Sequence, residues 1–296
     1  MKLEDMENAA VIGAGMMGSQ IAEILSRIGG YRVNLVDTNE SLVSKGLQNI
    51  DHRLEQFYLS KGKITLDQKK DIFSRIHGST SLSDAVHEVD FVIEAVVENM
   101  DLKKEIFRKL DSTAPPRAIL ASNTSLLNIS EIASATRRPD RVLGIHFFNP
   151  VATMQLVEVV KGSLTSEDVV QVACALARKL GKEQVVCNDF SFGFIANRAY
   201  RGMLDEAVQM VWERVAGPED IDKAIRLGYG LPKGPLELWD AIGGWAIKVA
   251  AEQDAIKELG NEKGRMHPLV RAMARTGYTG GKNKGIYDYW KDVLSK

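Results

Sequence analysis

A glycine-rich segment near the N-terminus places the strongest constraint on how this 296-residue chain can fold. Gly13, Gly15 and Gly18 close the apolar run Ala9–Gly13 and open the helical stretch Met16–Ile28. In such a turn the first glycine permits a tight bend, the second lets a ligand approach the backbone, and the third lets the helix pack closely on the strand. A strand, a tight turn and a helix in this order predict a βαβ unit and therefore a parallel sheet.

The same alternation of short apolar runs and amphipathic stretches continues through the first half of the chain. Further buried strands are expected at Val33–Asp37, Phe91–Val96, Ala118–Ser122, Val142–His146 and Leu156–Lys161. Helices are expected between them at Glu40–Leu59, Leu102–Leu110 and Glu167–Leu180. We expect Thr165 and Asp168 to form a capping box for the last helix and Gly181 to end it.

Only helical patterns follow the apolar pair Val185 and Val186. They cover Gly193–Val215, Pro218–Leu227, Pro235–Leu259 and His267–Ala274, and Pro218 after Gly217 restarts a helix. Two domains are therefore expected, residues 1–186 with the parallel sheet and residues 187–296 with helices alone. The apolar faces of these helices exceed what so small a domain can bury, which predicts a homodimer formed through them.

An acidic residue at the end of the second strand identifies the ligand of the glycine turn. Asp37 follows Gly18 by 19 residues, close to where the ribose of a dinucleotide lies in a Rossmann fold. The helix N-terminus offers N–H groups to a pyrophosphate, and the carboxylate accepts ribose hydroxyls but repels a 2′-phosphate. We expect NAD rather than NADP, held by the turn from Gly13 to Gly18, which includes Met16 and Met17, and by Asp37. A turn that only joins strand to helix is the alternative.

The composition excludes several classes of protein. The net charge of −1 gives no reason to expect binding of nucleic acid or of anionic membranes, and no stretch is long and apolar enough to span a bilayer. Cys174 and Cys187 form neither a CxxC pair nor a metal cluster, so reduced thiols and no metal are expected. The acidic N-terminus does not resemble a secretory or transit signal, which favours the cytoplasm.

His146 and Glu158 are the candidates for acid–base chemistry. His146 ends the strand Val142–His146, at the sheet edge where ligands of open α/β sheets bind. Glu158 interrupts the apolar run Leu156–Val160, where a carboxylate requires a donor. A carboxylate bonded to one imidazole nitrogen fixes the tautomer and leaves the other nitrogen to take a hydroxyl proton. For either residue alone, a satisfied core histidine or a surface glutamate is the alternative.

The segments around these two residues resemble the active-site signature of the 3-hydroxyacyl-CoA dehydrogenase family. They are Gly144–Pro150 and Leu156–Val160. Further segments that resemble the family follow in its order along nearly the whole chain: Ile93–Asn99, Ala121–Ser125, the pair Asn197–Arg198, and Gly234–Leu238.

The resemblance implies NAD-dependent oxidation of (S)-3-hydroxyacyl-CoA to 3-oxoacyl-CoA. It makes His146 the base and Glu158 its orienting partner, with Ser125 and Asn197 hydrogen-bonded to the reacting oxygen. The remaining implied contacts are Glu98, Lys103, Ser125, Asn149 and Lys282 to NAD, and Lys61 and Lys63, within the helical region from Leu47 to Asp67, to CoA.

Alternatives stay open at this point. Two segments depart from the usual pattern of the family: Tyr229–Lys233 and Lys282–Tyr287. The same catalytic residues could therefore oxidise a small alcohol without CoA, such as gulonate or carnitine. A non-catalytic NAD-binding or structural protein is the third interpretation. Ser125 could instead cap a helix beginning near Leu127, and Asn197 could be a solvated helix position. Lys61 with Lys63 could be a solvated turn, and Lys103 after Asp101 an ordinary surface charge.

Overall fold

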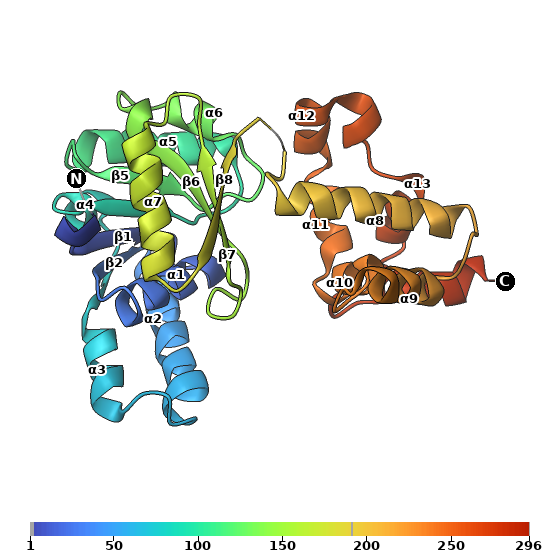
Figure 1. Cartoon of the computed structure of the whole chain (residues 1–296), viewed down its shortest axis with the longest axis horizontal. Helices are drawn as coiled ribbons and strands as arrows, with labels where there is room; N and C mark the ends of the chain where they lie inside the picture. The colour runs from blue at the N-terminus through green and yellow to red at the C-terminus, as the bar shows by residue number, and fades with distance from the viewer. Residues whose placement is uncertain (1–2, 191, 296) are drawn as a thin grey trace. The chain divides into compact units, whose positions relative to one another are not determined.

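The computed structural model describes residues 3–190 and 192–295. They form two compact units that divide the chain into Met1–Phe190 and Ser191–Lys296 (Figure 1). The boundary expected from the sequence falls at residue 186, four residues before the end of the first unit, because the last strand continues to Asn188.

The first unit is built on one eight-stranded sheet with the order β3-β2-β1-β4-β5-β6-β7-β8. Neighbouring strands are parallel except for β6 and β7, which are antiparallel. The strands are β1 Asn8–Ile12, β2 Arg32–Val36, β3 Ile76–Ser79, β4 Phe91–Glu94, β5 Ile119–Ser122, β6 Val142–Phe147, β7 Leu156–Lys161 and β8 Glu183–Asn188. The predicted α/β class with a mostly parallel, Rossmann-type sheet is confirmed.

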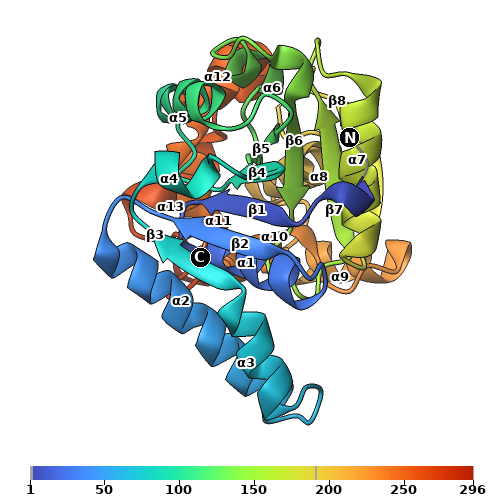
Figure 2. The same ribbon diagram turned by 90° about the vertical axis from the view of Figure 1, so that its left-hand side faces the viewer.

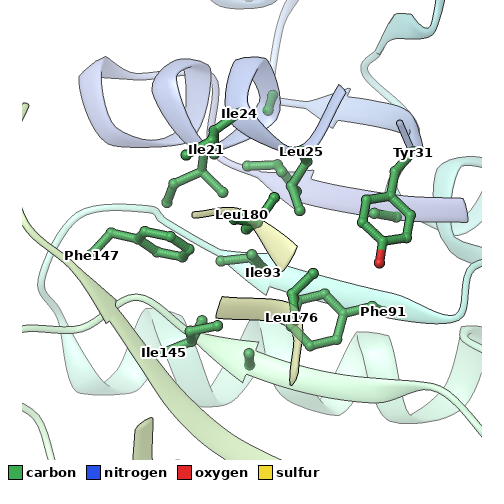
Figure 3. Close-up of a cluster of buried hydrophobic side chains, with 14 of the residues drawn as sticks. Ile21, Ile24, Leu25, Tyr31, Phe91, Ile93, Ile145, Phe147, Leu176 and Leu180 are labelled. Atoms are coloured by element: carbon green, nitrogen blue, oxygen red, sulfur yellow. The ribbon is translucent and has the colours of Figure 1, made fainter. Parts of the chain in front are cut away.

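Helices cover both faces of this sheet (Figure 2). On one face α1, Met16–Arg27, and α7, Glu167–Lys179, pack against the strands, while α4 Leu82–Val86, α5 Met100–Thr113 and α6 Ile129–Ala133 lie on the other. Figure 3 shows how the first of these layers is filled, with Ile21 and Leu25 of α1 and Leu176 of α7 meeting Ile93 and Ile145 of the sheet. Each such buried aliphatic side chain contributes about 1.5–3 kcal/mol, so this layer fixes α1 firmly against β1 and β4.

A helical arm extends from the sheet (Figures 1 and 2). It consists of α2 Glu40–Leu54, a π-helical turn η2 Glu55–Leu59, and α3 Leu66–Ser74. Thr65 and Gln68 form a capping box at the start of α3. Arg53 of α2 bonds Glu23 of α1 at 2.7 Å, which attaches the base of the arm to the helix that follows the glycine turn.

The second unit contains helices and no strand among its described residues. They are α8 Ala196–Trp212, α9 Pro218–Tyr229, α10 Pro235–Ala241, α11 Gly244–Ala250, α12 Glu252–Gly264, α13 Pro268–Arg275, α14 Ile286–Tyr289 and a π-helical turn η4 Trp290–Leu294. Leu204, Val208, Trp245 and Met273 are fully buried at its centre. Helix α9 does begin at Pro218 after the N-cap Gly217, as predicted.

The structure corrects several local predictions. The stretch expected as one helix over Pro235–Leu259 is divided into three. Gly243, with a φ of +70°, breaks the helical path between α10 and α11, and Ala251, with a ψ of 1°, separates α11 from α12. The capping box at Thr165 is wrong: the N-cap of α7 is Ser166, and the Thr165 hydroxyl donates to the Val142 carbonyl instead. Strands β3 and β8 and helices α3 and α4 were not predicted. No helix within residues 3–190 or 192–295 is long and apolar enough to cross a membrane.

Candidate active site

The carboxyl ends of four neighbouring strands meet at one edge of the sheet. Because β1, β4, β5 and β6 are parallel, the segments that follow them all begin at this edge. Strand β1 lies between β2 and β4 in the sheet. The chain passes from β1 through α1 to β2 on one side, and later returns to form β4 on the other side of β1. Ligands of open α/β sheets bind at this kind of switch point.

The glycine turn is shaped to bring a ligand close to the backbone of α1. Gly13 has a φ of +104°, and a Cβ there would lie 2.7 Å from the Ala95 carbonyl oxygen. A Cβ on Gly18 would overlap the Gly13 carbonyl, so neither position tolerates a side chain. Gly15, the N-cap of α1, is different: a Cβ there would meet nothing within 4 Å, and no side chain caps the helix. The start of α1 is therefore open at Gly15, and uncapped N-terminal amides of a helix are typical binding groups for phosphate.

The two methionines of this turn have different environments. Met16 is exposed, with 63% of its surface accessible, whereas Met17 packs against the hydrophobic core. Asp37 lies beside the turn at the end of β2 and is half-buried. Its carboxylate accepts hydrogen bonds from the backbone N–H of Ala14 and of Thr38, each at 2.7 Å. Asp37 thus holds the turn in place, and carboxylate lone pairs remain for a ribose.

His146 and Glu158 are cross-strand partners in the antiparallel pair of β6 and β7. The imidazole Nδ1 lies 2.7 Å from Glu158 Oε2, and the two residues are 3% and 0% exposed. The contact inferred from the sequence is present. Since a carboxylate only accepts hydrogen bonds, Nδ1 carries the hydrogen, and Nε2 is the nitrogen through which the ring can exchange a proton with a substrate. The Phe148 ring packs on the imidazole, with the ring centroids 4.4 Å apart.

Cys187 lies on β8, close enough to this pair to sense its charge. Burial, followed by the carboxylates of Glu158 and Asp189, raises the pKa of the thiol to about 11. Cys187 is therefore protonated at neutral pH and unsuited to act as a nucleophile.

Glu98 organises the turn that follows β5. Its Oε1 accepts hydrogen bonds from the Thr124 hydroxyl at 2.5 Å, the Ser125 amide at 2.9 Å and the Leu126 amide at 3.0 Å. The same turn is tied to the end of β6 by Asn123, whose Oδ1 accepts from the Phe147 amide at 2.9 Å. Ser125 therefore follows the strand beside the one that carries His146.

Ser125 does not serve as a helix cap. Helix α6 begins at Ile129, and its N-cap is Asn128, whose side chain accepts from the Glu131 amide at 2.8 Å. The structural alternative considered for Ser125 is thereby excluded.

Lys103 is buried, contrary to the interpretation of this residue as an ordinary surface charge. The side chain is 1% exposed, and its Nζ donates to Glu94 Oε1 at 2.7 Å and lies 3.5 Å from Glu98 Oε2. Glu94, fully buried, also accepts from the Val96 amide and the Ser122 hydroxyl, both at 2.7 Å. The Lys103 ammonium thus acts on the turn that carries Ser125 through its ion pair with Glu98. Glu94 was not predicted to have a role, although a carboxylate in the otherwise apolar strand β4 was the available signal.

Asn149 lies just beyond β6, in an exposed position. Its Oδ1 accepts a hydrogen bond at 3.0 Å from Nε2 of Gln20, a buried residue of α1 that the sequence analysis also passed over. This bond connects the glycine-turn helix to the segment that follows His146.

Lys61 and Lys63 lie apart from this edge, in the exposed turn between η2 and α3 at the far end of the arm (Figure 1). Their ammonium groups lie 5.5 Å from the Phe57 ring centre and 5.8 Å from the Tyr58 ring centre, respectively. The structure does not join them to the His146 site.

Asn197 and Lys282 belong to the second unit. Asn197 lies in the first turn of α8, and Lys282 in an exposed turn before α14. The described part of the chain contains no group of three or more His, Cys, Asp or Glu side chains that could hold a metal ion.

Comparison with known proteins gives consistent matches over both units. The profile of the 3-hydroxyacyl-CoA dehydrogenase NAD binding domain matches residues 8–190, and that of the 3-hydroxyacyl-CoA dehydrogenase C-terminal domain matches residues 193–289. The chain is 43% identical to a probable 3-hydroxybutyryl-CoA dehydrogenase of Bacillus subtilis, over 96% of this chain and 98% of that protein. It is 37% identical to the human mitochondrial hydroxyacyl-coenzyme A dehydrogenase, over 96% and 91% respectively.

A solved structure agrees with these matches. The crystal structure of (S)-3-hydroxybutyryl-CoA dehydrogenase PaaH1 from Ralstonia eutropha superimposes with a TM-score of 0.89 at 37% identity, covering 96% of this chain and 99% of that one.

Proposed function

Because the chain belongs to the 3-hydroxyacyl-CoA dehydrogenase family, we propose that it oxidises (S)-3-hydroxyacyl-CoA to 3-oxoacyl-CoA with NAD as the hydride acceptor. The observation that carries the chemical part of this proposal is the hydrogen-bonded pair of His146 and Glu158 at the carboxyl edge of the sheet. The family assignment carries the choice of substrate.

His146 is the catalytic base in this proposal. Its Nε2 removes the proton of the 3-hydroxyl group, and the resulting imidazolium is stabilised by the Glu158 carboxylate on Nδ1. When bound, NAD supplies the acceptor for the hydride that leaves the same carbon. In the reverse direction the imidazolium returns its proton to the oxygen. Burial of both side chains excludes water, which strengthens the charge interaction between them.

Ser125 and Asn197 bind the reacting oxygen in this mechanism. The Ser125 turn is held by Glu98, and Glu98 by the buried Lys103, so the hydroxyl is carried on a rigid segment. Hydrogen bonds to an oxygen that gains charge during the reaction favour the transition state over the ground state.

The cofactor-binding residues are those of the glycine turn, from Gly13 through Met16 and Met17 to Gly18, together with Asp37, Glu98, Ser125, Asn149 and Lys282. Lys103 contributes through its ion pair with Glu98. Two observations support a dinucleotide: the open space at Gly15 and the uncapped first turn of α1. NAD is favoured over NADP because a 2′-phosphate beside the Asp37 carboxylate would be repelled.

The CoA moiety is assigned to the helical arm. Lys61 and Lys63 carry two exposed positive charges in a turn where a phosphate can approach from solvent. This assignment extends the site beyond the sheet edge.

A substrate panel tests the proposed function. NADH formation is followed by absorbance with 3-hydroxybutyryl-CoA, longer 3-hydroxyacyl-CoA thioesters, gulonate and carnitine, with NAD and with NADP. We expect turnover with the thioesters and NAD. Turnover only with the CoA-free alcohols would reject the substrate class, and no turnover with any of them would indicate a non-catalytic protein.

A further inference from the structure

Gln20 lies on the second turn of α1, and its carboxamide makes three hydrogen bonds. Nε2 donates to the Met16 carbonyl at 3.1 Å and to Asn149 Oδ1 at 3.0 Å, and Oε1 accepts from the Val151 amide at 2.9 Å. Two of the three partners are backbone groups. The Val151 N–H can only donate and the Met16 carbonyl can only accept, so the orientation of the Gln20 amide is fixed by the main chain.

The orientation of Asn149 follows from that of Gln20. Because Nε2 of Gln20 donates, Asn149 must turn its oxygen toward α1, and its Nδ2 then points the other way. Among the described residues, the hydrogen bond of the Asn149 side chain is the one that its Oδ1 accepts from Gln20. Asn149 is exposed and lies three residues beyond His146, so this N–H donor is available to a ligand at the carboxyl edge.

A second buried side chain holds the same segment from the other end. Lys182, which follows α7, donates its ammonium to the carbonyls of Val151 and Met154, the latter at 2.8 Å. The amide of Val151 is therefore bonded to Gln20 and its carbonyl to Lys182. The backbone that follows Asn149 is thereby held in place beside Gln20, and the Gln20 N–H keeps the Asn149 oxygen turned toward α1.

We propose that Gln20 is a positioning residue that presents the Nδ2 donor of Asn149 to an oxygen of the bound cofactor. The inference rests on the proposed function, because it takes Asn149 to contact NAD. It adds that Asn149 must donate a hydrogen bond to the cofactor, and that Gln20 of α1 orients this donor.

A double-mutant cycle on cofactor affinity tests this role. The dissociation constant of NADH is measured by fluorescence titration for the full-length chain and for Gln20→Met, Asn149→Ala and the double variant. Loss of one hydrogen bond weakens binding by about three- to tenfold, which is the effect expected for each single variant. The double variant is expected to bind within about twofold of Asn149→Ala, because Gln20 then has no amide left to orient.

Two further variants separate positioning from folding. Ser26→Ala removes another buried side-chain hydrogen bond of α1, to the Ile72 carbonyl, and is expected to lower the unfolding temperature without changing NADH affinity. Asn149→Asp leaves Gln20 intact but replaces the Nδ2 donor with an oxygen, and is expected to weaken NADH binding at least as much as Gln20→Met does.

Specific results would overturn the inference. They are additive losses in the double variant, wild-type affinity in Gln20→Met, or wild-type affinity in Asn149→Asp. Failure of the proposed function gives a different result, because the unaltered protein would then fail to turn over 3-hydroxybutyryl-CoA, whatever its affinity for NADH.

Discussion

Glu158 is a fully buried carboxylate in the middle of an apolar strand, and His146 is the donor that makes this position tolerable. Removing one member of a buried pair leaves the other member without its hydrogen-bond partner, which is costly. We expect Glu158→Gln to fold, because the amide oxygen can still accept from Nδ1. The neutral amide cannot stabilise an imidazolium, so kcat should fall by roughly 10- to 100-fold, less than for loss of the base itself.

The measurement is steady-state kinetics with 3-hydroxybutyryl-CoA over a range of pH, with NADH affinity as the control. A kcat within twofold of the unaltered protein, with an unchanged pH profile, would show that the carboxylate has no part in the reaction.

For individual residues, the sequence predicts a contact when strand or helix geometry sets the spacing of the two side chains. His146 and Glu158 are joined by strand register, so a carboxylate interrupting an apolar run was enough to infer its partner. Gln20 and Asn149 are 129 positions apart, and their contact depends on how α1 lies on the sheet. The burial of Lys103 was not predicted for a similar reason. Which face of α5 is buried depends on the elements packed against this helix, and its own sequence does not show them.

At the scale of elements, the glycine turn allows a matched comparison of two substitutions. Gly18→Ala should destabilise the first unit by about 3 kcal/mol or more, because its Cβ would overlap the Gly13 carbonyl. Gly15→Ala should fold almost normally, since a Cβ there meets only open space, but should weaken NADH binding about tenfold by occupying the approach to the helix N-terminus.

Thermal unfolding and NADH titration of both variants distinguish the two effects. Equal losses of stability, or unchanged NADH affinity in Gly15→Ala, would contradict the assignment of this turn to a pyrophosphate.

Elements with a strong local pattern were predicted, and elements without one were not. The central strands are continuous apolar runs and were found within a few residues. Strand β3 has only one fully buried residue, Ile76, and contains a glycine, so its sequence carries no strand signal. Thr165 illustrates the competition between local and distant partners: its hydroxyl bonds the Val142 carbonyl, 23 positions away, rather than the helix that follows it.

At the scale of the whole molecule, the second unit leaves several large apolar side chains exposed. They include Trp212, Val215, Leu227, Tyr229, Ile242 and Ile247. We expect this surface to be covered by a second copy of the chain, as the sequence pattern of these helices predicted.

Sedimentation at micromolar concentration should therefore give the mass of a dimer. Leu227→Glu combined with Tyr229→Glu should shift it toward the monomer, whereas Leu164→Glu, at an equally exposed apolar position of the first unit, should not. A monomer for the unaltered protein would refute the prediction.

The removal of the hydroxyl proton by His146 is tested most directly by His146→Gln. In this variant we measure kcat for NADH formation from 3-hydroxybutyryl-CoA together with the dissociation constant of NADH. We expect kcat to fall by about 10²- to 10⁴-fold while NADH affinity stays within about twofold. A variant that turns over within a few-fold of the unaltered protein would contradict this role of His146.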